Sequence, residues 1–259
     1  MTHPPPQVRV RGVAIVTGSG VGIGRALCGA FAERGYLVFG LDIDHDSNLE
    51  TASLIGALMT AVACDVGNSA DVKAVFDEII AVNAHIDVLV NNAAVWNDTT
   101  LTGGTYDQQV DAFHRAFDAC AMGSFHCTAA AVPAMGPGSN VVNMITEHIR
   151  SHRLITGAVA TGYDGAKFTQ WRLTESWARE LRPKGIRVNG LAFGATDTPM
   201  LRSVAPAVAD NSMRAEDMAD AVMAIIDQGP QGPMGQVYDV GFSGTPRDES
   251  LRQIAAIRS

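Results

Sequence analysis

The chain has 259 residues, of which 47% are apolar and 18% charged, and it carries a formal net charge of -8. This length and apolar content allow one α/β domain with a large buried core. The acidic balance and the absence of a Lys- or Arg-rich run argue against a nucleic-acid partner, because phosphate binding needs clustered positive charge. Small-molecule chemistry is the class that fits better.

The N-terminal end and the cysteines indicate in which compartment the protein is expected. Residues 1–11, with Pro4 to Pro6, are expected to form a flexible tail, and residues 12–259 a single folded domain. The tail lacks an apolar core of signal-peptide length, and no later stretch is apolar over about 18 residues. We therefore expect a soluble, cytoplasmic protein without membrane contact. Four scattered cysteines without a Cys-x-x-Cys pair indicate free thiols and no metal site.

From Val13 onward, apolar runs rich in Val, Ile and Leu alternate with segments of helical periodicity. This alternation predicts a Rossmann-type α/β fold, in which a doubly wound parallel sheet of about seven strands carries helices on both faces. Asn68 or Ser69 is a candidate helix N-cap, and Gly35 and Gly185 are candidate helix stops. The predicted strands are 13–17, 36–42, 59–64, 86–91, 139–145, 186–192 and 237–240, and the predicted helices are 22–34, 70–82, 105–134, 161–182 and 214–227.

A glycine-rich turn follows the first predicted strand, between Thr17 and Gly24. Its glycines fall where a phosphate can approach bare backbone N–H groups at the start of a helix, which favours a dinucleotide site. Such turns also serve merely to join a strand to a helix, so the motif needs a second signal. The candidate cofactor-binding residues of the turn are Gly18, Ser19, Gly22, Ile23 and Gly24.

Asp42 gives that second signal at the end of the next predicted strand, 18 residues beyond Gly24. A carboxylate at this place accepts hydrogen bonds from the ribose hydroxyls and repels a 2′-phosphate. No Lys or Arg follows nearby, so NAD is the predicted cofactor rather than NADP. The alternative is that Asp42 or Asp44 simply opens the loop.

Tyr163 and Lys167 are four residues apart in the predicted helix 161–182. Side chains at this spacing share one helix face. A positive charge beside a phenol lowers its pKa from about 10, which would make Tyr163 an acid or base usable near neutral pH. Together with the glycine turn, the pair predicts hydride transfer on a dinucleotide, with Tyr163 as the general acid/base. A plain surface pair is the alternative interpretation.

The glycine spacing, Asp65-Val66, the run from Asn91 to Ala94 and the Tyr-x-x-x-Lys pair resemble the short-chain dehydrogenase/reductase family over about residues 12–243. The modest length resembles the single-domain branch of that family. The resemblance implies that Asp65 meets the adenine ring, that Lys167 holds the nicotinamide ribose, and that Thr198 contacts the nicotinamide carboxamide. It also implies a homotetramer or homodimer. The cofactor-binding residues that it adds are Cys64, Asp65, Val66, Asn92, Ala93, Ala94, Tyr163, Lys167, Thr196 and Thr198.

The family also places a serine hydroxyl at the end of its fifth strand, where this chain has Thr146. Threonine can fill that role, since its hydroxyl both donates and accepts hydrogen bonds. Thr146 lies 17 residues before Tyr163, which is farther than is usual in the family, so Ser151 is a rival. We favour Thr146 because a strand end fixes a side chain better than a loop does.

Three further positions depart from the family pattern. Cys120 stands where relatives usually have the asparagine that helps to hold a proton-relay water, which leaves a rerouted relay open. Phe193-Gly194 replaces a usual Pro-Gly pair, and Ala94 replaces a usual glycine. These departures affect details of the site and leave the Tyr163 assignment in place.

The expected pocket is bordered by loops at 95–104, 146–160 and 199–213. Their apolar residues predict a mostly apolar alcohol or ketone as substrate. Residues 147–153 also include two His and two Arg, among which His148 is the candidate for direct substrate contact, although such a loop is usually solvated. The candidate substrate-binding residues are Trp96, His148 and Met200, and Leu201 and Val204 add to the apolar border.

The sequence thus predicts an NAD-dependent oxidoreductase that interconverts a secondary alcohol and its ketone. Its catalytic residues would be Tyr163, Lys167 and Thr146. A rival from another class is a dinucleotide-binding sensor or structural subunit that has lost turnover, which Cys120 and the displaced hydroxyl motivate. An enoyl reductase is a third candidate, but that group usually spaces its Tyr and Lys more widely.

Overall fold

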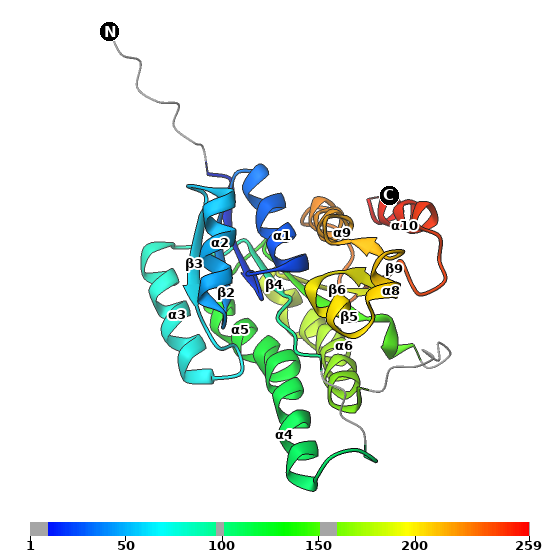
Figure 1. Ribbon diagram of the computed structural model, residues 1–259. Coiled ribbons are helices and arrows are strands. Elements are labelled where there is room, and N and C mark those ends of the chain that lie inside the picture. Colours follow the sequence, from blue (N-terminus) through cyan, green and yellow to red (C-terminus); the bar gives the residue numbers. More distant parts are fainter. Residues whose placement is uncertain (1–9, 97–100, 151–159, 259) are drawn as a thin grey trace.

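Seven parallel strands form one twisted sheet in the computed structural model, which describes residues 10–96, 101–150 and 160–258. The strand order β3-β2-β1-β4-β5-β6-β9 reverses direction between β1 and β4, as in a doubly wound sheet. Figure 1 shows β3 near one end of the sheet and β9 near the other. The strands are β1 (Gly12–Thr17), β2 (Tyr36–Asp42), β3 (Met59–Ala63), β4 (Val88–Asn91), β5 (Asn140–Thr146), β6 (Arg187–Phe193) and β9 (Val237–Val240).

Helices cover both faces of the sheet, as predicted. One layer contains α1 (Gly22–Glu33), α2 (His45–Ile55), α9 (Ala215–Asp227) and α10 (Arg247–Ile257). The other contains α3 (Ser69–Val82), α4 (Tyr106–Phe117), α5 (Gly123–Ala131) and α6 (Thr161–Leu181). Two short helices, α7 (Pro199–Val204) and α8 (Pro206–Ala209), and the two-residue strands β7 (Thr196–Asp197) and β8 (Met213–Arg214) lie between β6 and α9 in the chain.

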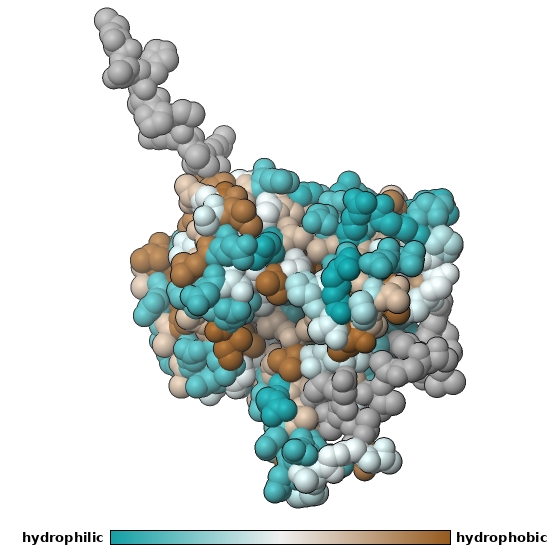
Figure 2. All heavy atoms as spheres, in the orientation of Figure 1, coloured by the Kyte–Doolittle hydropathy of each residue, from teal (hydrophilic) through white to brown (hydrophobic). Residues whose placement is uncertain are grey.

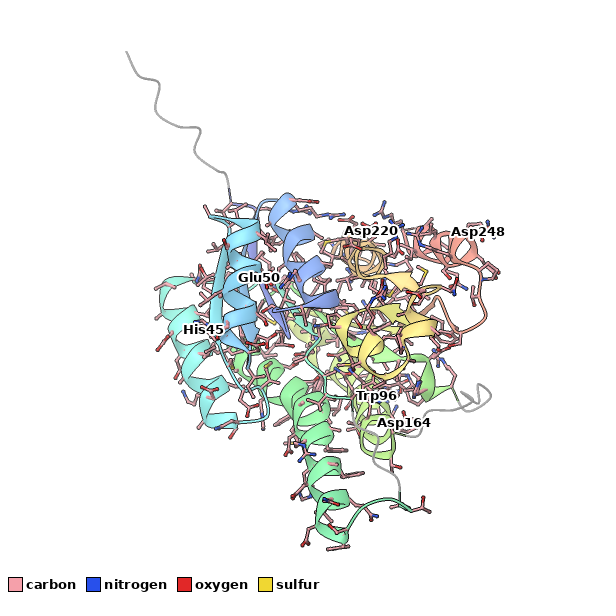
Figure 3. The ribbon with its side chains drawn as sticks, in the orientation of Figure 1. His45, Glu50, Trp96, Asp164, Asp220 and Asp248 are labelled. Atoms are coloured by element: carbon pink, nitrogen blue, oxygen red, sulfur yellow. The ribbon has the colours of Figure 1, made fainter. Side chains whose placement is uncertain are left out.

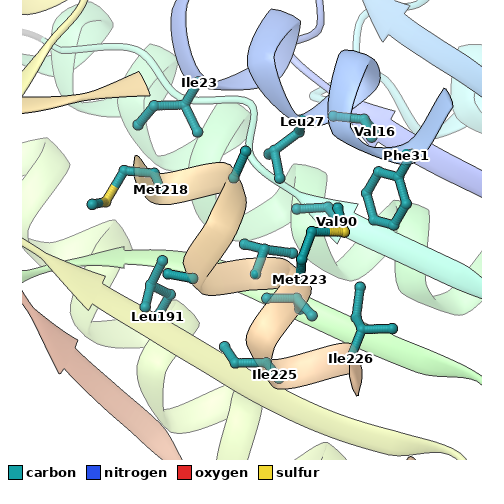
Figure 4. Close-up of a cluster of buried hydrophobic side chains, with 14 of the residues drawn as sticks. Val16, Ile23, Leu27, Phe31, Val90, Leu191, Met218, Met223, Ile225 and Ile226 are labelled. Atoms are coloured by element: carbon teal, nitrogen blue, oxygen red, sulfur yellow. The ribbon is translucent and has the colours of Figure 1, made fainter. Parts of the chain in front are cut away.

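The core of the first layer is centred on α9, in which every residue from Asp217 to Ile226 except Asp220 is buried. Figure 4 shows Leu27 and Phe31 of α1 in the same buried cluster as Met218 and Met223 of α9. A helix that is apolar almost all round is typical of a position between a sheet and other helices. On the face seen in Figure 2, hydrophilic side chains gather over the α9 and α10 region.

The helices differ from the sequence prediction in two ways. First, α2, α7, α8 and α10 form where no helix was predicted. Second, the predicted helix 105–134 contains a π-helical turn, Asp118–Met122, between α4 and α5, and it ends in a 3-10 turn. The predicted N-cap of α3 is confirmed, because the Asn68 side chain accepts hydrogen bonds from the backbone N–H groups of Ala70 and Asp71.

Two further findings concern the expectations about thiols and membranes. The four cysteines are free, and all of them are buried. Among the helices of the described residues, none has both the length and the apolar character needed to cross a bilayer.

We expect Leu27→Ala to lower the free energy of unfolding by about 2–5 kcal/mol, because this side chain is fully buried and its loss leaves a cavity facing α9. Leu54→Ala on α2 removes the same atoms from a side chain that is 68% exposed, and it should change the free energy by less than about 1 kcal/mol. Urea unfolding at one protein concentration measures both variants. Equal losses in the two variants would contradict the assigned core.

Candidate active site

A cavity of about 1580 Å³ opens at the carboxyl ends of the parallel strands. Its lining includes Gly18 after β1, Asp42 at the end of β2, Asn92 after β4, Thr146 at the end of β5 and Phe193 at the end of β6. The cavity therefore spans the point where the strand order reverses. Ligands of open α/β sheets bind in the crevice at this place.

The glycine turn is held against β4 by hydrogen bonds. The Asn92 side-chain amide donates to the carbonyls of Thr17 at 2.9 Å and Gly18 at 3.1 Å. Gly18 has φ +66°, and a Cβ at Gly24 would lie 1.8 Å from the Gly18 carbonyl oxygen. Only glycine fits at Gly24, where a Cβ would collide with the turn, and the positive φ at Gly18 strongly favours glycine there.

This turn leaves room for an anion at the start of α1. The helix begins at Gly22, and its N-cap residue Val21 makes no side-chain hydrogen bond to the first turn. The first backbone N–H groups of α1 are therefore without a side-chain cap, and Gly22 lines the cavity. Uncapped N–H groups at a helix N-terminus suit a phosphate, so the residues present fit the pyrophosphate of a dinucleotide.

Asp42 is fixed in the cavity wall by two backbone groups. Its Oδ2 accepts from the Gly20 N–H at 2.8 Å, and its Oδ1 accepts from the Asp44 N–H at 2.9 Å. Its carboxylate oxygens retain capacity for further hydrogen bonds. The neighbouring cavity residues Leu41 and Ile43 carry no positive charge that could attract a phosphate. The cavity wall is thus acidic at the end of β2.

Most of the predicted cofactor residues line this cavity, and two do not. The Ser19 hydroxyl is buried and donates to Asn48 Oδ1 at 2.7 Å, so this side chain ties the turn to α2 rather than facing a ligand. Gly24 acts through the close packing described above. The predicted residues that line the cavity are Gly18, Gly22, Ile23, Asp42, Cys64, Asp65, Val66, Asn92, Ala93, Ala94, Tyr163, Lys167, Thr196 and Thr198.

Tyr163 lies on α6 with its ring in contact with other rings of the cavity wall. The ring centroid lies 5.0 Å from that of Trp96 and 6.0 Å from that of His148, and the Thr146 side chain is close enough to the phenol to affect its pKa. Burial raises the pKa of Tyr163 above its usual value, and the nearby Cys120 and Asp164 raise it further, whereas the Thr146 side chain lowers it. The phenol is therefore held in its protonated form at neutral pH.

Lys167 is buried one helical turn after Tyr163. Its Nζ donates to the Met144 carbonyl at 2.6 Å and to Gln170 Oε1 at 3.0 Å, and it lies 5.7 Å from the centroid of the Tyr163 ring. Burial lowers the pKa of Lys167, because it disfavours the charged ammonium. The expected lowering of the Tyr163 pKa by Lys167 is therefore wrong for this structure, because burial of the phenol outweighs the attraction of an ammonium that is directed at Met144.

Gln170 is a site residue that the sequence prediction missed. Its side-chain amide accepts from Lys167 and donates to Ser124 Oγ at 2.7 Å, and Ser124 in turn donates to the Cys120 carbonyl at 2.6 Å. This buried chain of hydrogen bonds connects Lys167 to the π-helical turn. The signal that could have found Gln170 is its position three residues after Lys167, on the same face of α6.

The three predicted substrate residues, Trp96, His148 and Met200, all line the cavity. The His148 ring lies 5.7 Å from the Trp96 ring, and its Nδ1 lies 2.6 Å from Asp164 Oδ1 on α6. Figure 3 shows Trp96 and Asp164 in the same region of the molecule. Thr146 is placed beside Tyr163, whereas its rival Ser151 lies outside the described residues.

Comparison with known proteins places this site in a family. A family model described as Enoyl-(Acyl carrier protein) reductase matches residues 18–238. The 7alpha-hydroxysteroid dehydrogenase of Escherichia coli is 28% identical over 247 residues, which cover 89% of this chain and 93% of that protein. Sorbitol dehydrogenase of Cereibacter sphaeroides is 30% identical over 247 residues, covering 92% of each. D-xylose 1-dehydrogenase of Caulobacter vibrioides is 35% identical over 196 residues, covering 71% of each.

The fold is also found among solved structures. The 3-ketoacyl-(acyl-carrier-protein) reductase from Brucella melitensis, complexed with NADH, matches with a TM-score of 0.78 and 24% identity, covering 89% of this chain and 97% of that one. The match at this identity concerns the fold. The family model spans most of the sequence, and the relatives named above are dehydrogenases. The chain therefore belongs to the short-chain dehydrogenase/reductase family, which uses a nicotinamide dinucleotide cofactor.

Proposed function

We propose that the protein is an NAD-dependent dehydrogenase that interconverts a secondary alcohol and its ketone. The observation that carries the proposal is the position of Tyr163, which lines the cavity at the carboxyl edge of the sheet together with Thr146 and Lys167. The relatives named for a hydroxysteroid, sorbitol and xylose support an alcohol as the substrate. Their diversity leaves the substrate itself open.

The residues divide the proposed chemistry between them. Bound in the cavity, the cofactor would accept or supply the hydride. Thr146 would hold the substrate oxygen by hydrogen bonding, and Tyr163 would exchange the proton with that oxygen. In oxidation the carbinol carbon loses its hydrogen with two electrons, the hydroxyl proton goes to the Tyr163 oxygen, and a ketone results. In reduction the Tyr163 proton completes the new hydroxyl.

Lys167 and the buried side chains that hydrogen-bond to it would form the deepest part of the site. Its ammonium is anchored by the Met144 carbonyl and by Gln170, one helical turn after Tyr163. Gln170 and Ser124 connect this charge to the Cys120 carbonyl through side chains. We infer that this chain of side chains fixes the position of Lys167. Relatives usually have an asparagine at the position of Cys120.

We expect Tyr163→Phe to lower kcat/KM by roughly 100-fold or more, because general acid/base catalysis contributes about that much. Binding of NADH, measured by fluorescence titration, should be retained, since the substitution removes one oxygen from the cavity wall. The activity assay follows NADH absorbance with a panel of cyclic and aromatic secondary alcohols.

Equal activity of Tyr163→Phe and the wild type would contradict the assigned role of Tyr163. Binding of NADH without turnover of any alcohol by the wild type would instead favour the sensor or structural subunit. Turnover restricted to α,β-unsaturated thioesters would favour an enoyl reductase.

The pH dependence follows from the raised pKa of Tyr163. A raised pKa keeps the phenol protonated at neutral and mildly alkaline pH, and ketone reduction needs this proton. We therefore expect kcat/KM for reduction to stay constant between about pH 7 and pH 9, and kcat/KM for alcohol oxidation, which needs the deprotonated oxygen, to rise with pH. A fall in the rate of reduction centred near pH 7 would contradict this assignment.

Asp42→Asn should shift the cofactor preference. The amide keeps the shape of the carboxylate but loses the negative charge that would repel a 2′-phosphate, so the ratio of NADPH to NADH dissociation constants should fall about 10-fold. Asp77→Asn on α3 removes the same charge from a side chain that is 63% exposed, and it should leave the ratio unchanged. Fluorescence titration measures both cofactors, and tighter binding of NADPH than NADH by the wild type would overturn the choice of NAD.

A further inference from the structure

A second polar pair lies beside Tyr163 and has no part in the proton transfer described above. His148 lies in the 3-10 turn Glu147–Ile149 directly after β5, and Asp164 follows Tyr163 on α6. The Nδ1 of His148 lies 2.6 Å from Asp164 Oδ1. The side chain of His148 is 14% exposed and lines the cavity, whereas that of Asp164 is 43% exposed. One nitrogen of the ring is therefore committed to a carboxylate.

The ring of His148 is held in a defined orientation. It meets the Tyr163 ring edge-on at 6.0 Å and the Trp96 ring edge-on at 5.7 Å. Its own backbone N–H donates to the Thr146 hydroxyl oxygen at 3.4 Å. The substrate-side wall of the cavity thus includes three rings in mutual contact, those of Trp96, Tyr163 and His148.

The bond to Asp164 decides what His148 can offer a ligand. A carboxylate accepts only, so the shared proton lies on Nδ1, and Nε2 of the neutral imidazole is an acceptor. Within the described part of the chain, the ring makes no hydrogen bond through Nε2. An acceptor fixed next to the proton-transferring phenol suits a hydroxyl group, which can donate to it.

We propose that His148, positioned by Asp164, accepts a hydrogen bond from a second substrate hydroxyl on the carbon next to the reacting one. The inference rests on the proposed alcohol dehydrogenase function and names its substrate class: a vicinal diol in oxidation and an α-hydroxy ketone in reduction. The Tyr163 and His148 rings are direct neighbours, with centroids 6.0 Å apart, and two hydroxyls on adjacent carbons are the closest pair that a substrate can present to them.

The remaining cavity wall defines the rest of this substrate. Met200, Val204 and Val208, on α7 and α8, are apolar and partly exposed, so the body of the substrate is apolar. A carboxylate beside the reacting carbon is disfavoured because Asp164 carries negative charge next to His148. Lys167, the basic residue adjacent to Tyr163, has its ammonium directed at Met144 and Gln170.

The experiment compares matched pairs of alcohols. The ratio of kcat/KM for cis-1,2-cyclohexanediol to that for cyclohexanol, and for 2,3-butanediol to 2-butanol, isolates the second hydroxyl. We expect the wild type to prefer the diols about 10-fold. His148→Phe keeps a ring against Trp96 and Tyr163 but removes the acceptor, so the ratio should fall to near one.

Two aspartate variants test the positioning role. Asp164→Asn removes the charge that fixes the imidazole proton on Nδ1, and the ratio should fall several-fold. Asp220→Asn, the same change at an exposed position of α9 (Figure 3), should leave the ratio at the wild-type value. A residue that merely ties the turn after β5 to α6 would alter both alcohols of a pair by the same factor and leave the ratio unchanged.

Three results would overturn the inference while leaving the proposed function standing. They are equal kcat/KM values for diol and mono-alcohol in the wild type, an unchanged ratio in His148→Phe, and a preference for the 2-hydroxy acid lactate over the diols.

If no alcohol is oxidised, the proposed function fails, and thermal unfolding of the NADH-saturated protein decides the inference. A larger rise in Tm with diol than with mono-alcohol, lost in His148→Phe, supports it, and equal rises refute it.

Discussion

A buried ammonium group at the carboxyl edge of the sheet is the constraint on which the arrangement of the site depends. Lys167 is 2% exposed, and its partners are the Met144 carbonyl and the Gln170 amide rather than a carboxylate. A buried charge is tolerated only where hydrogen bonds replace water. These hydrogen bonds therefore fix α6 relative to the end of β5 and to the helix formed by α4 and α5. Because Tyr163 lies one turn before Lys167 on α6, they also place Tyr163 in the cavity wall.

The π-helical turn Asp118–Met122 contributes to this arrangement. It widens the helix where α4 meets α5, and the carbonyl of Cys120 within it accepts the hydrogen bond of Ser124 that ends the chain from Lys167. Single π-helical turns are frequent at functional sites because they redirect backbone groups without breaking the helix. The Cys120 side chain packs with Tyr163 and Ala166, and its electrostatic effect raises the Tyr163 pKa in addition to burial.

The parts of this structure that depend on local spacing could be predicted from the sequence. The strands were found because buried parallel strands are continuously apolar, and Tyr163 and Lys167 were found because a spacing of four residues fixes their common face. Helix α2 was missed because its buried residues, Asn48 and Thr51, are polar and give no apolar period. The contact of His148 with Asp164 and the pKa of Tyr163 depend on how separate elements pack, which no spacing along the chain encodes.

In the proposed function, the groups that transfer the proton and those that select the substrate lie on different parts of the fold. Thr146, Tyr163 and Lys167 lie on β5 and α6, whose positions are set by the sheet and by the buried ammonium. Trp96 follows β4, Met200 lies on the short helix α7, and His148 lies in the turn after β5, so these residues lie outside the strands of the sheet. The relatives named for a steroid, a sugar and a sugar alcohol are 28–35% identical to this chain, and in such a fold function resides in the residues placed on it rather than in the fold itself.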